Sequence, residues 1–362
     1  METVRVAIGD GGYPVHVGAG LISEFGKHIR EATQRERVVV LADVNAAKFH
    51  GAKLKRSLRT AGIKVHKWIE IPSGERSKSW SRAHSLLNEV IESGADRWTP
   101  ILAFGGGVTG DLAGFVASLL FRGVPLVQIP TTVIAQVDSS VGGKTGINFA
   151  GAKNIVGSFY QPKVVLADPS LLLTLSERDY RAGLAEVVKI GMTLRPDLFE
   201  RLEGDVLHFT TCDPETLAPA VLACVEAKAE VVGRDEKDQD VRSILNYGHT
   251  IGHAVEALSL GKLRHGEAVA IGMNAAARVG EAVGITPSEV RIRQNTLLSE
   301  LGLKLTYPGA DNRAIARKLK LDKKVRDKRT RFVLTLQIGG ASVWPHIPEK
   351  YLRGAIRKVT RA

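Results

Sequence analysis

The hydrophobic positions in the first half of the chain fall into short, nearly continuous runs separated by helical patterns. Runs rich in Val, Ile and Leu occupy residues 37–42, 64–71, 100–104, 124–129 and 163–167. Runs of this length are typical of strands buried on both faces of a sheet. Because they alternate with helical patterns, they predict an α/β Rossmann-like domain with a mostly parallel sheet.

The pattern changes after Pro169 to longer amphipathic segments, at residues 176–192, 214–233, 242–258 and 266–283. Their period is that of surface helices, so the second half is predicted to be mainly α-helical. Near the end, the runs 332–338 and 341–346 flank Gly339-Gly340 and predict a hairpin, and residues 349–359 predict a last helix. We therefore predict an α/β domain at residues 1–170 and a mainly α-helical domain at residues 171–362.

The composition is that of an ordinary globular protein, with 44% hydrophobic and 24% charged residues among 362. No stretch approaches the roughly 18 apolar residues of a membrane span, and the start of the chain does not resemble a signal peptide. We therefore expect a cytoplasmic protein without a membrane partner. The spacing of Cys212 and Cys224 matches neither a redox pair nor a zinc knuckle, so we expect them to be buried or free thiols.

The net charge of +12 is compatible with a nucleic acid or with a small polyanionic substrate. Much of the excess lies in residues 313–331, where ten Lys and Arg face only Asp322 and Asp327. The aromatic side chains that would stack on bases are not interleaved with these charges. The sequence therefore favours a small anionic substrate over nucleic acid.

Three glycines follow the predicted strand 100–104 and precede an apolar helical pattern. Gly105, Gly106 and Gly107 therefore stand where a strand turns into a helix, which is typical of a pyrophosphate site. The spacing is not the usual G-x-G-x-x-G, and tight packing alone would also explain such a turn. Asp43, just beyond the strand 37–42, is placed to bind a ribose, or to cap the helix that follows.

Histidines four residues apart, His249 and His253, must share one face of a helix. Thr250 stands where a metalloprotease of this pattern has its glutamate, so that chemistry is excluded. His265 begins the next helical segment, and Glu186 lies on an earlier one, so one carboxylate and two imidazoles from three segments could bind a divalent metal.

At this point the sequence resembles the 3-dehydroquinate synthase family, from about residue 71 to 325. The blocks that carry the resemblance are Gly74-Glu75-Arg76-Ser77-Lys78, 105–111, Phe121-Arg122-Gly123, Pro130-Thr131-Thr132, 136–145, Lys153-Asn154, 183–189, 228–232, 242–253, 265–269 and Asp322-Lys323-Lys324-Val325. So many blocks in one order are far more specific than any single motif. The first 70 residues match only loosely.

The resemblance implies a role for each matched residue. For the metal, zinc or cobalt, it implies Glu186, His249 and His265. For NAD, it implies Asp43, Glu75, Lys78, Gly105, Gly106, Gly107, Asp111, Thr131, Thr132, Asp138, Lys144 and Lys153. For the substrate, it implies Arg122, Lys144, Asn154, Lys189, Lys228, Arg242, Asn246, His253, and Lys323 or Lys324. For catalysis, it implies His253, Lys144, Lys189, Asn246 and Glu186, with His253 moving protons.

The resemblance also implies the activity and the assembly. The family converts 3-deoxy-D-arabino-heptulosonate 7-phosphate to 3-dehydroquinate in the shikimate pathway, as a homodimer in which Arg122 reaches the neighbouring subunit's substrate. Other interpretations remain open at single residues: Lys189 can simply pair with Glu186, and Arg242 can cap the acidic stretch 235–240. At the level of function, the alternatives are a deoxy-inosose or valiolone synthase, a metal-dependent glycerol or alcohol dehydrogenase, and a basic nucleic-acid-binding module.

Overall fold

The computed structural model describes residues 1–9, 11–325 and 332–361, and for residues 320–325 it describes the backbone alone. The chain divides into two compact units. The first contains residues 1–175 and 214–237, and the second contains residues 176–213 and 238–362. None of the helices within the described ranges has the length and hydropathy that a membrane span requires.

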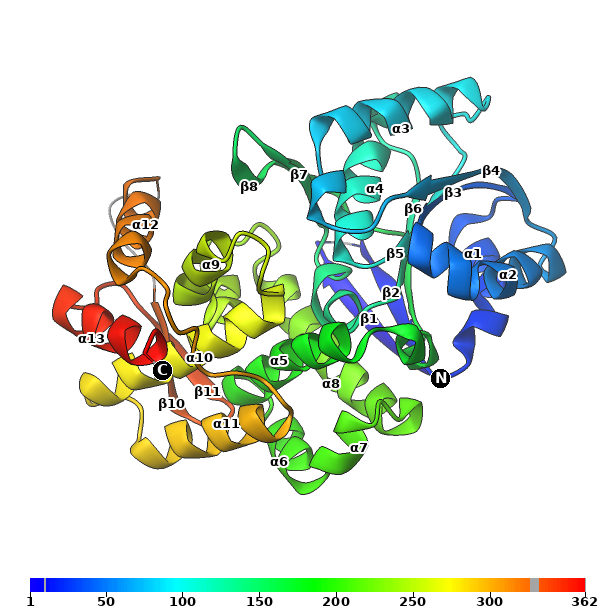
Figure 1. Cartoon of the computed structure of the whole chain (residues 1–362). Helices are drawn as coiled ribbons and strands as arrows, with labels where there is room; N and C mark the ends of the chain where they lie inside the picture. Colours follow the sequence, from blue (N-terminus) through cyan, green and yellow to red (C-terminus); the bar gives the residue numbers. More distant parts are fainter. Residues whose placement is uncertain (10, 326–331, 362) are drawn as a thin grey trace. The chain divides into compact units, whose positions relative to one another are not determined.

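A seven-stranded sheet forms the centre of the first unit (Figure 1). Its strands are β1 (Glu2–Ile8), β2 (Gly11–Val17), β3 (Arg37–Asp43), β4 (Lys64–Ile71), β5 (Ile101–Gly105), β6 (Leu126–Pro130) and β9 (Val164–Ala167). They lie in the order β1-β2-β9-β6-β5-β3-β4, and only β1 and β2 pair antiparallel. All five predicted strands are present, so the predicted α/β class is confirmed. The prediction that all five are buried is wrong for β4, which lies at the edge of the sheet and is mostly exposed or half-buried.

Helices cover both faces of this sheet. The helices α1 (Phe25–Thr33) and α2 (Val44–Thr60) pack on one face, and α3 (Trp80–Glu92) and α4 (Gly107–Leu119) pack on the other. Strand β3 shows the reason, because Val38 and Val40 join the first core while Val39 and Leu41 join the second. Burial of each such side chain stabilises the fold by roughly 1.5–3 kcal/mol, as estimated from transfer free energies.

Shorter elements complete the first unit. They are η1 (Leu21–Ser23), η2 (Glu75–Ser77), η3 (Leu120–Arg122), the π-helix η4 (Ala135–Ser139), η5 (Pro169–Thr174), and a hairpin of β7 (Lys144–Phe149) and β8 (Ala152–Phe159). The long helix α8 (Pro214–Arg234) also belongs here, because it packs against β1, β2, η4 and η5. The division by contacts therefore differs from the predicted ranges 1–170 and 171–362.

The second unit is mainly helical, which confirms the predicted character of this half. Its elements are α5 (Glu177–Thr193), α6 (Pro196–Gly204), α7 (Val206–Thr210), η6 (Val241–Asn246), α9 (His249–Leu258), α10 (His265–Ala282), α11 (Ser288–Glu300), α12 (Asn312–Val325), the hairpin of β10 (Phe332–Gln337) and β11 (Gly340–Trp344), and α13 (Glu349–Val359). Helix α10 is central and packs against α5, α9, α11, α13 and β10.

The segment 242–258 was predicted as one amphipathic stretch, and that prediction is wrong in one respect. Gly248 interrupts it with a φ of 77°, which is the left-handed conformation, so η6 ends at Asn246 and α9 begins at His249. A Cβ at Gly248 would also lie 2.6 Å from the side chain of Met273. The break therefore places His249 at the first turn of its own helix.

Candidate metal centre and nucleotide-binding turn

Three helices of the second unit bring the predicted metal ligands together. Glu186 of α5 is fully buried, and its Oε1 lies 3.6 Å from Nε2 of His249 and 3.3 Å from Nε2 of His265. One turn further along α5, Lys189 is also buried and forms an ion pair with Glu186. The pairing of Lys189 with Glu186, one of the two interpretations of Lys189, is thus observed, and it places Lys189 beside the predicted metal ligands.

His253 completes a group of three imidazoles. The ligand atoms of His249, His253 and His265 all lie within 4.8 Å of one another, and the His253 ring is 5.0 Å from the His249 ring and 5.7 Å from the His265 ring. His249 is buried, whereas His253 is exposed. The i, i+4 spacing on α9 therefore directs both side chains to one point, as predicted, and leaves His253 open to solvent.

Close packing of the helix backbones holds this group in place. A Cβ at Gly266 would lie 1.7 Å from the backbone oxygen of Ala182, so only glycine allows α10 to approach α5 at the residue after His265. The first turn of α10 is fixed by Glu267, whose carboxylate accepts a hydrogen bond of 2.8 Å from the Arg264 backbone. Arg178 of α5 donates two hydrogen bonds to the same carboxylate.

The surroundings favour a charged carboxylate beside a neutral imidazole. Burial by itself would raise the pKa of Glu186, but Lys189, His249 and His265 hold it well below its usual value. Burial, and then Lys189, lower the pKa of His249 to about 3. Burial also opposes the charged form of His265, yet Glu186 and Glu256 raise its pKa to about 10.

The donor set fits a divalent metal such as zinc or cobalt. Both oxygens of Glu186 are inaccessible to solvent and lack a hydrogen-bond donor in good geometry. The Nδ1 atoms of His249 and His265 are already engaged, at 3.1 Å by the Tyr247 carbonyl and at 3.0 Å by Glu256, so each ring presents Nε2. One carboxylate oxygen and two imidazole nitrogens are the ligands of a catalytic zinc site that keeps an open position.

Two more residues of this unit that were predicted to bind substrate lie in η6. Arg242 is only 3% exposed and lies in the 3-10 helix η6, which ends at the partly buried Asn246. Asp240 directly precedes this helix as its N-cap residue. The side chains of Lys323 and Lys324 lie outside the part of the chain that the structure describes.

The first unit contains the predicted nucleotide-binding turn. Strand β5 ends at Gly105, Gly106 is the N-cap of α4, and α4 begins at Gly107. A Cβ would lie 2.8 Å from Asp43 at Gly105, 3.0 Å from Thr132 at Gly106, and 2.9 Å from Ser139 at Gly107. The neighbouring side chains therefore leave little room for a Cβ at these positions, and the start of α4 presents free amides.

Two predicted NAD contacts meet beside this turn. Lys78 is only 4% exposed, and its ammonium binds the carboxylate of Asp111 on α4 and the side chain of Asn154 on β8. Burial raises the pKa of Asp111, although Lys78 acts in the opposite direction. Glu75 accepts a hydrogen bond of 2.8 Å from Asn148.

Asp43 and Asp138 already have protein partners. Asp43 caps α2, because its Oδ1 accepts from the backbone of Asn45 at 2.8 Å and of Ala46 at 3.3 Å. The helix-capping interpretation of Asp43 is thus observed, and its predicted contact with NAD stays a prediction. Asp138 on the π-helix η4 accepts from the buried Lys228 of α8 at 2.5 Å.

The remaining predicted residues of the first unit differ in exposure. Lys144, Lys153 and Arg122 are exposed, on β7, β8 and η3, where a free ligand or a second chain could contact them. Thr131 is buried directly after β6, and the side chain of Thr132 accepts from the Ala135 backbone at 3.2 Å.

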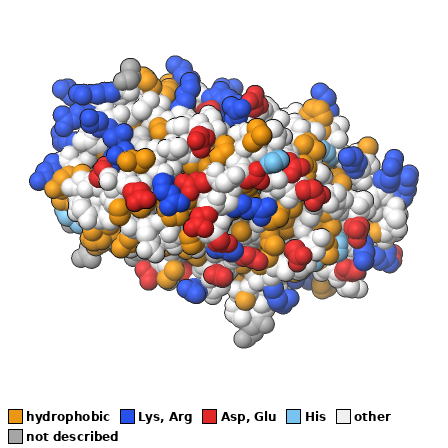
Figure 2. Space-filling model, turned by 90° about the horizontal axis from the view of Figure 1, so that it is seen from below, with side chains coloured by type: hydrophobic (Ala, Val, Ile, Leu, Met, Phe, Trp, Pro, Cys, Tyr) orange, Lys and Arg blue, Asp and Glu red, His pale blue; other side chains and the backbone are white. Residues whose placement is uncertain are grey.

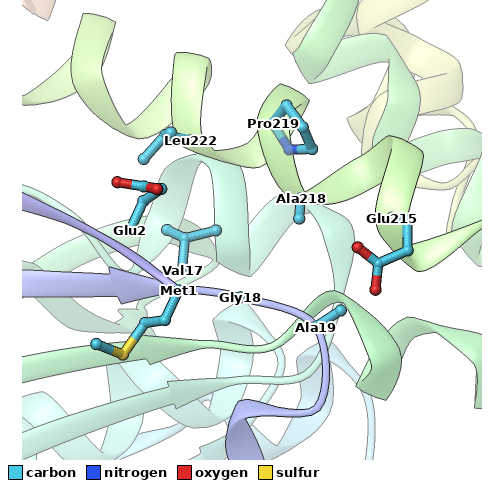
Figure 3. Close-up of a pocket in the computed structure, with 9 residues that line it drawn as sticks. All are labelled: Met1, Glu2, Val17, Gly18, Ala19, Glu215, Ala218, Pro219 and Leu222. Carbon is cyan, nitrogen blue, oxygen red and sulfur yellow. The ribbon is translucent and has the colours of Figure 1, made fainter.

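The surface adds little to the list of sites. Basic and acidic side chains are mixed over much of the face that Figure 2 shows. A cavity of about 230 Å³ in the first unit lies between the start of the chain and α8 (Figure 3). It is lined mainly by apolar atoms with Glu2 and Glu215, and it contains none of the predicted site residues.

Glu256 was not among the predicted residues. Its carboxylate contacts His265, and it stands seven residues after His249 on α9. The i, i+4, i+7 spacing of His249, His253 and Glu256 is the signal that could have identified it.

Comparison with known proteins gives one consistent result. Residues 68–182 match the family model for the 3-dehydroquinate synthase N-terminal part, and residues 183–325 match that for the C-terminal part. Among curated proteins, the 3-dehydroquinate synthase of Geobacter metallireducens is 42% identical over 95% of each chain. That of Cereibacter sphaeroides is 41% identical over 99% of this chain and 98% of its own.

Solved structures of similar fold bind the expected cofactors. The 2-epi-5-epi-valiolone synthase of Streptomyces hygroscopicus, with NAD+ and Zn2+ bound, has a TM-score of 0.89 at 27% identity and covers 98% of both chains. A 2-deoxy-scyllo-inosose synthase complexed with carbaglucose-6-phosphate, NAD+ and Co2+ has a TM-score of 0.90 at 28% identity, over 99% of this chain and 100% of the other. A glycerol dehydrogenase of Schizosaccharomyces pombe, at 18% identity and a TM-score of 0.67, shares the fold.

Proposed function

Because the chain belongs to the 3-dehydroquinate synthase family, we propose that it converts 3-deoxy-D-arabino-heptulosonate 7-phosphate into 3-dehydroquinate and phosphate. The observation that carries this proposal is the cluster of Glu186, His249 and His265, in which one carboxylate and two imidazoles face one another. The enzyme is a phosphate-eliminating lyase of the shikimate pathway that uses NAD and one divalent metal.

The reaction requires temporary oxidation, because the substrate must lose phosphate beside an unactivated carbon. Bound NAD would supply a reversible hydride acceptor for this oxidation, and a divalent ion held by Glu186, His249 and His265 would supply a Lewis acid for the alcohol oxygen. The ketone makes the neighbouring C–H acidic, so phosphate can leave. After re-reduction, ring opening and an intramolecular aldol addition form the carbocycle.

In the second unit, Glu186, His249 and His265 would hold the metal through Oε and Nε2 atoms. We assign proton transfer to His253, because it is exposed and lies on the same face of α9 as His249. Lys189 stands one turn from Glu186, where an ammonium can stabilise negative charge on a substrate oxygen. Asn246, at the end of η6, would orient the substrate through its amide.

The anionic groups of the substrate need fixed cations. Arg242 and Lys228 are both buried, at 3% and 4% exposure, so each requires an anionic or accepting partner. Lys228 contacts Asp138, and we propose that it exchanges part of this contact for a substrate oxygen. Lys144, Asn154, Arg122 and one of Lys323 or Lys324 would complete the set for phosphate and carboxylate.

In the first unit, the turn at Gly105–Gly107 would hold the pyrophosphate of NAD. The amides at the start of α4 and the positive end of its dipole stabilise an anion there. We assign Asp43, Glu75, Lys78, Asp111, Thr131, Thr132, Asp138, Lys144 and Lys153 to the remaining contacts with NAD. We further propose a cytoplasmic homodimer, in which Arg122 contributes to the partner's substrate site.

A comparison of substrates tests this proposal against other sugar phosphate cyclases. The heptulosonate phosphate carries a carboxylate, whereas sedoheptulose 7-phosphate and glucose 6-phosphate do not. We expect phosphate release from the heptulosonate phosphate alone, because of the three substrates only this one offers a carboxylate to the buried cations. Faster phosphate release from either carboxylate-free sugar would contradict the proposal and indicate a valiolone or deoxy-inosose synthase.

A further inference from the structure

The carboxylate of Glu256 lies behind one of the proposed metal ligands. Its side chain is 14% exposed, and its Oε2 is 3.0 Å from Nδ1 of His265. It shares one face of α9 with His249 and His253, at positions i, i+4 and i+7. One helix therefore supplies a proposed ligand, the proposed proton-transfer residue and this carboxylate.

The imidazole of His265 stands between two carboxylates. Its Nδ1 contacts Glu256, and its Nε2 lies 3.3 Å from Oε1 of Glu186. When Nδ1 carries the proton donated to Glu256, Nε2 keeps a lone pair directed at the centre of the cluster. The acceptor at Nδ1 thus determines which nitrogen can bind a cation.

The two ligand histidines need orientation to different degrees. His249 is buried, and its Nδ1 is held by the backbone oxygen of Tyr247 two residues before it. His265 is the first residue of α10, and its side chain is 31% exposed. Packing alone therefore restricts the His265 ring less, and its orientation depends on a side chain from another helix.

We propose that Glu256 is a positioning residue, which fixes the tautomer and ring orientation of His265 for binding of the divalent metal. The negative charge of Glu256 also favours a cation bound nearby. This inference rests on the proposed metal centre. It gives Glu256 a role that does not require contact with the substrate or with NAD.

Metal affinity and a spectroscopic signature test this role independently of turnover. The metal-free parent and its variants compete with a chelating indicator for Co2+, and the visible spectrum of the bound cobalt is recorded. We expect Glu256→Ala to bind Co2+ about 10- to 100-fold more weakly, as is typical when such a supporting partner is removed, with an altered spectrum. Glu256→Gln keeps an acceptor for Nδ1 and should lie between Glu256→Ala and the parent.

Glu281→Ala is the matched control. Glu281 lies near the other end of α10 and pairs with Arg291 at 2.7 Å, so its loss removes an ion pair without touching His265. We expect this variant to bind cobalt like the parent. Parent-like affinity and spectrum in Glu256→Ala, or an equal loss in Glu256→Ala and Glu281→Ala, would overturn the inference.

A ligand variant separates this inference from the function on which it rests. His249→Ala should lose cobalt binding almost completely. If His249→Ala bound cobalt like the parent, the metal centre itself would be misplaced, and the role of Glu256 would be wrong with it. If only Glu256→Ala behaved like the parent, the metal centre would stand and the positioning role alone would fail.

Discussion

At the scale of single residues, chemistry at this site depends on burial as much as on residue type. Arg242 and Lys189 are ordinary cations in the sequence, but the fold buries them to 3% and 1% exposure. A buried cation needs an anionic or accepting partner, because losing that partner costs several kcal/mol. We therefore expect these two residues to favour substrates that carry anionic groups.

Replacing Arg242 by Met tests substrate recognition. The substitution keeps much of the volume and removes the guanidinium that can bind a carboxylate through two parallel hydrogen bonds. We expect kcat/KM for the heptulosonate phosphate to fall by roughly 100-fold or more, with metal and NAD affinity unchanged. Steady-state kinetics and calorimetric titration measure both.

The matched control for this variant is Arg293→Met. Arg293 lies in the same unit, pairs with Glu203 at 2.5 Å and lies over the ring of Phe199, so its replacement also removes a paired guanidinium, although this one is more exposed than Arg242. It should retain the kinetics of the parent. Parent-like turnover by Arg242→Met would remove Arg242 from the substrate site.

The positions of the histidines could be predicted from spacing alone, whereas their partners could not. A separation of four residues on a helix places His249 and His253 on one face whatever the fold is. The cap of α2 by Asp43 is also local in sequence, and it was one of the two roles predicted for that residue. The contact between His265 and Glu256 joins two helices, so it follows from the tertiary structure.

At the scale of elements, the turn between β5 and α4 allows a test of the proposed nucleotide site. In Gly106→Val, the added Cβ would lie 3.0 Å from Cγ2 of Thr132, and we expect the new side chain to obstruct the proposed pyrophosphate contact. We expect NAD affinity to fall by at least about 100-fold while the far-ultraviolet circular dichroism stays that of the parent, because glycine here allows close approach of the ligand.

Gly354→Val provides the comparison, because no atom lies within 4 Å of a Cβ at this position of α13. Its NAD affinity, measured by calorimetry, should equal that of the parent. Unchanged affinity in Gly106→Val would move the nucleotide site elsewhere.

Four of the five predicted strands are buried almost completely. The interior strands β3, β5, β6 and β9 are almost entirely buried and read as apolar runs. The hairpin of β7 and β8 was missed, because most of β8 is exposed and its pattern is not that of a core strand. The edge strand β1 was missed for the same reason.

At the scale of the whole molecule, sequence order and spatial order differ. Helix α8 follows α5, α6 and α7 in the chain but packs against the sheet of the first unit. Its periodicity predicts a helix with a buried face and does not specify which partner covers that face. A single predicted boundary at residue 170 could therefore not assign residues 214–237 to the first unit.

The two proposed cofactor sites lie in different units of the chain. The first unit holds the turn assigned to NAD, and the second holds the cluster assigned to the metal. A cyclase needs both and returns the hydride within each turnover, whereas a dehydrogenase of the same fold releases NADH. The net charge of +12 adds attraction for an anionic substrate.

The stoichiometry of one turnover experiment tests this claim most directly. The purified protein is incubated with the heptulosonate phosphate, a small amount of NAD and either zinc or cobalt, while phosphate, dehydroquinate and NADH are followed together. We predict equal amounts of phosphate and dehydroquinate, many times the amount of NAD present, with no net NADH and no reaction after exhaustive chelation. Accumulation of NADH in proportion to product, or full turnover after chelation, would contradict the account.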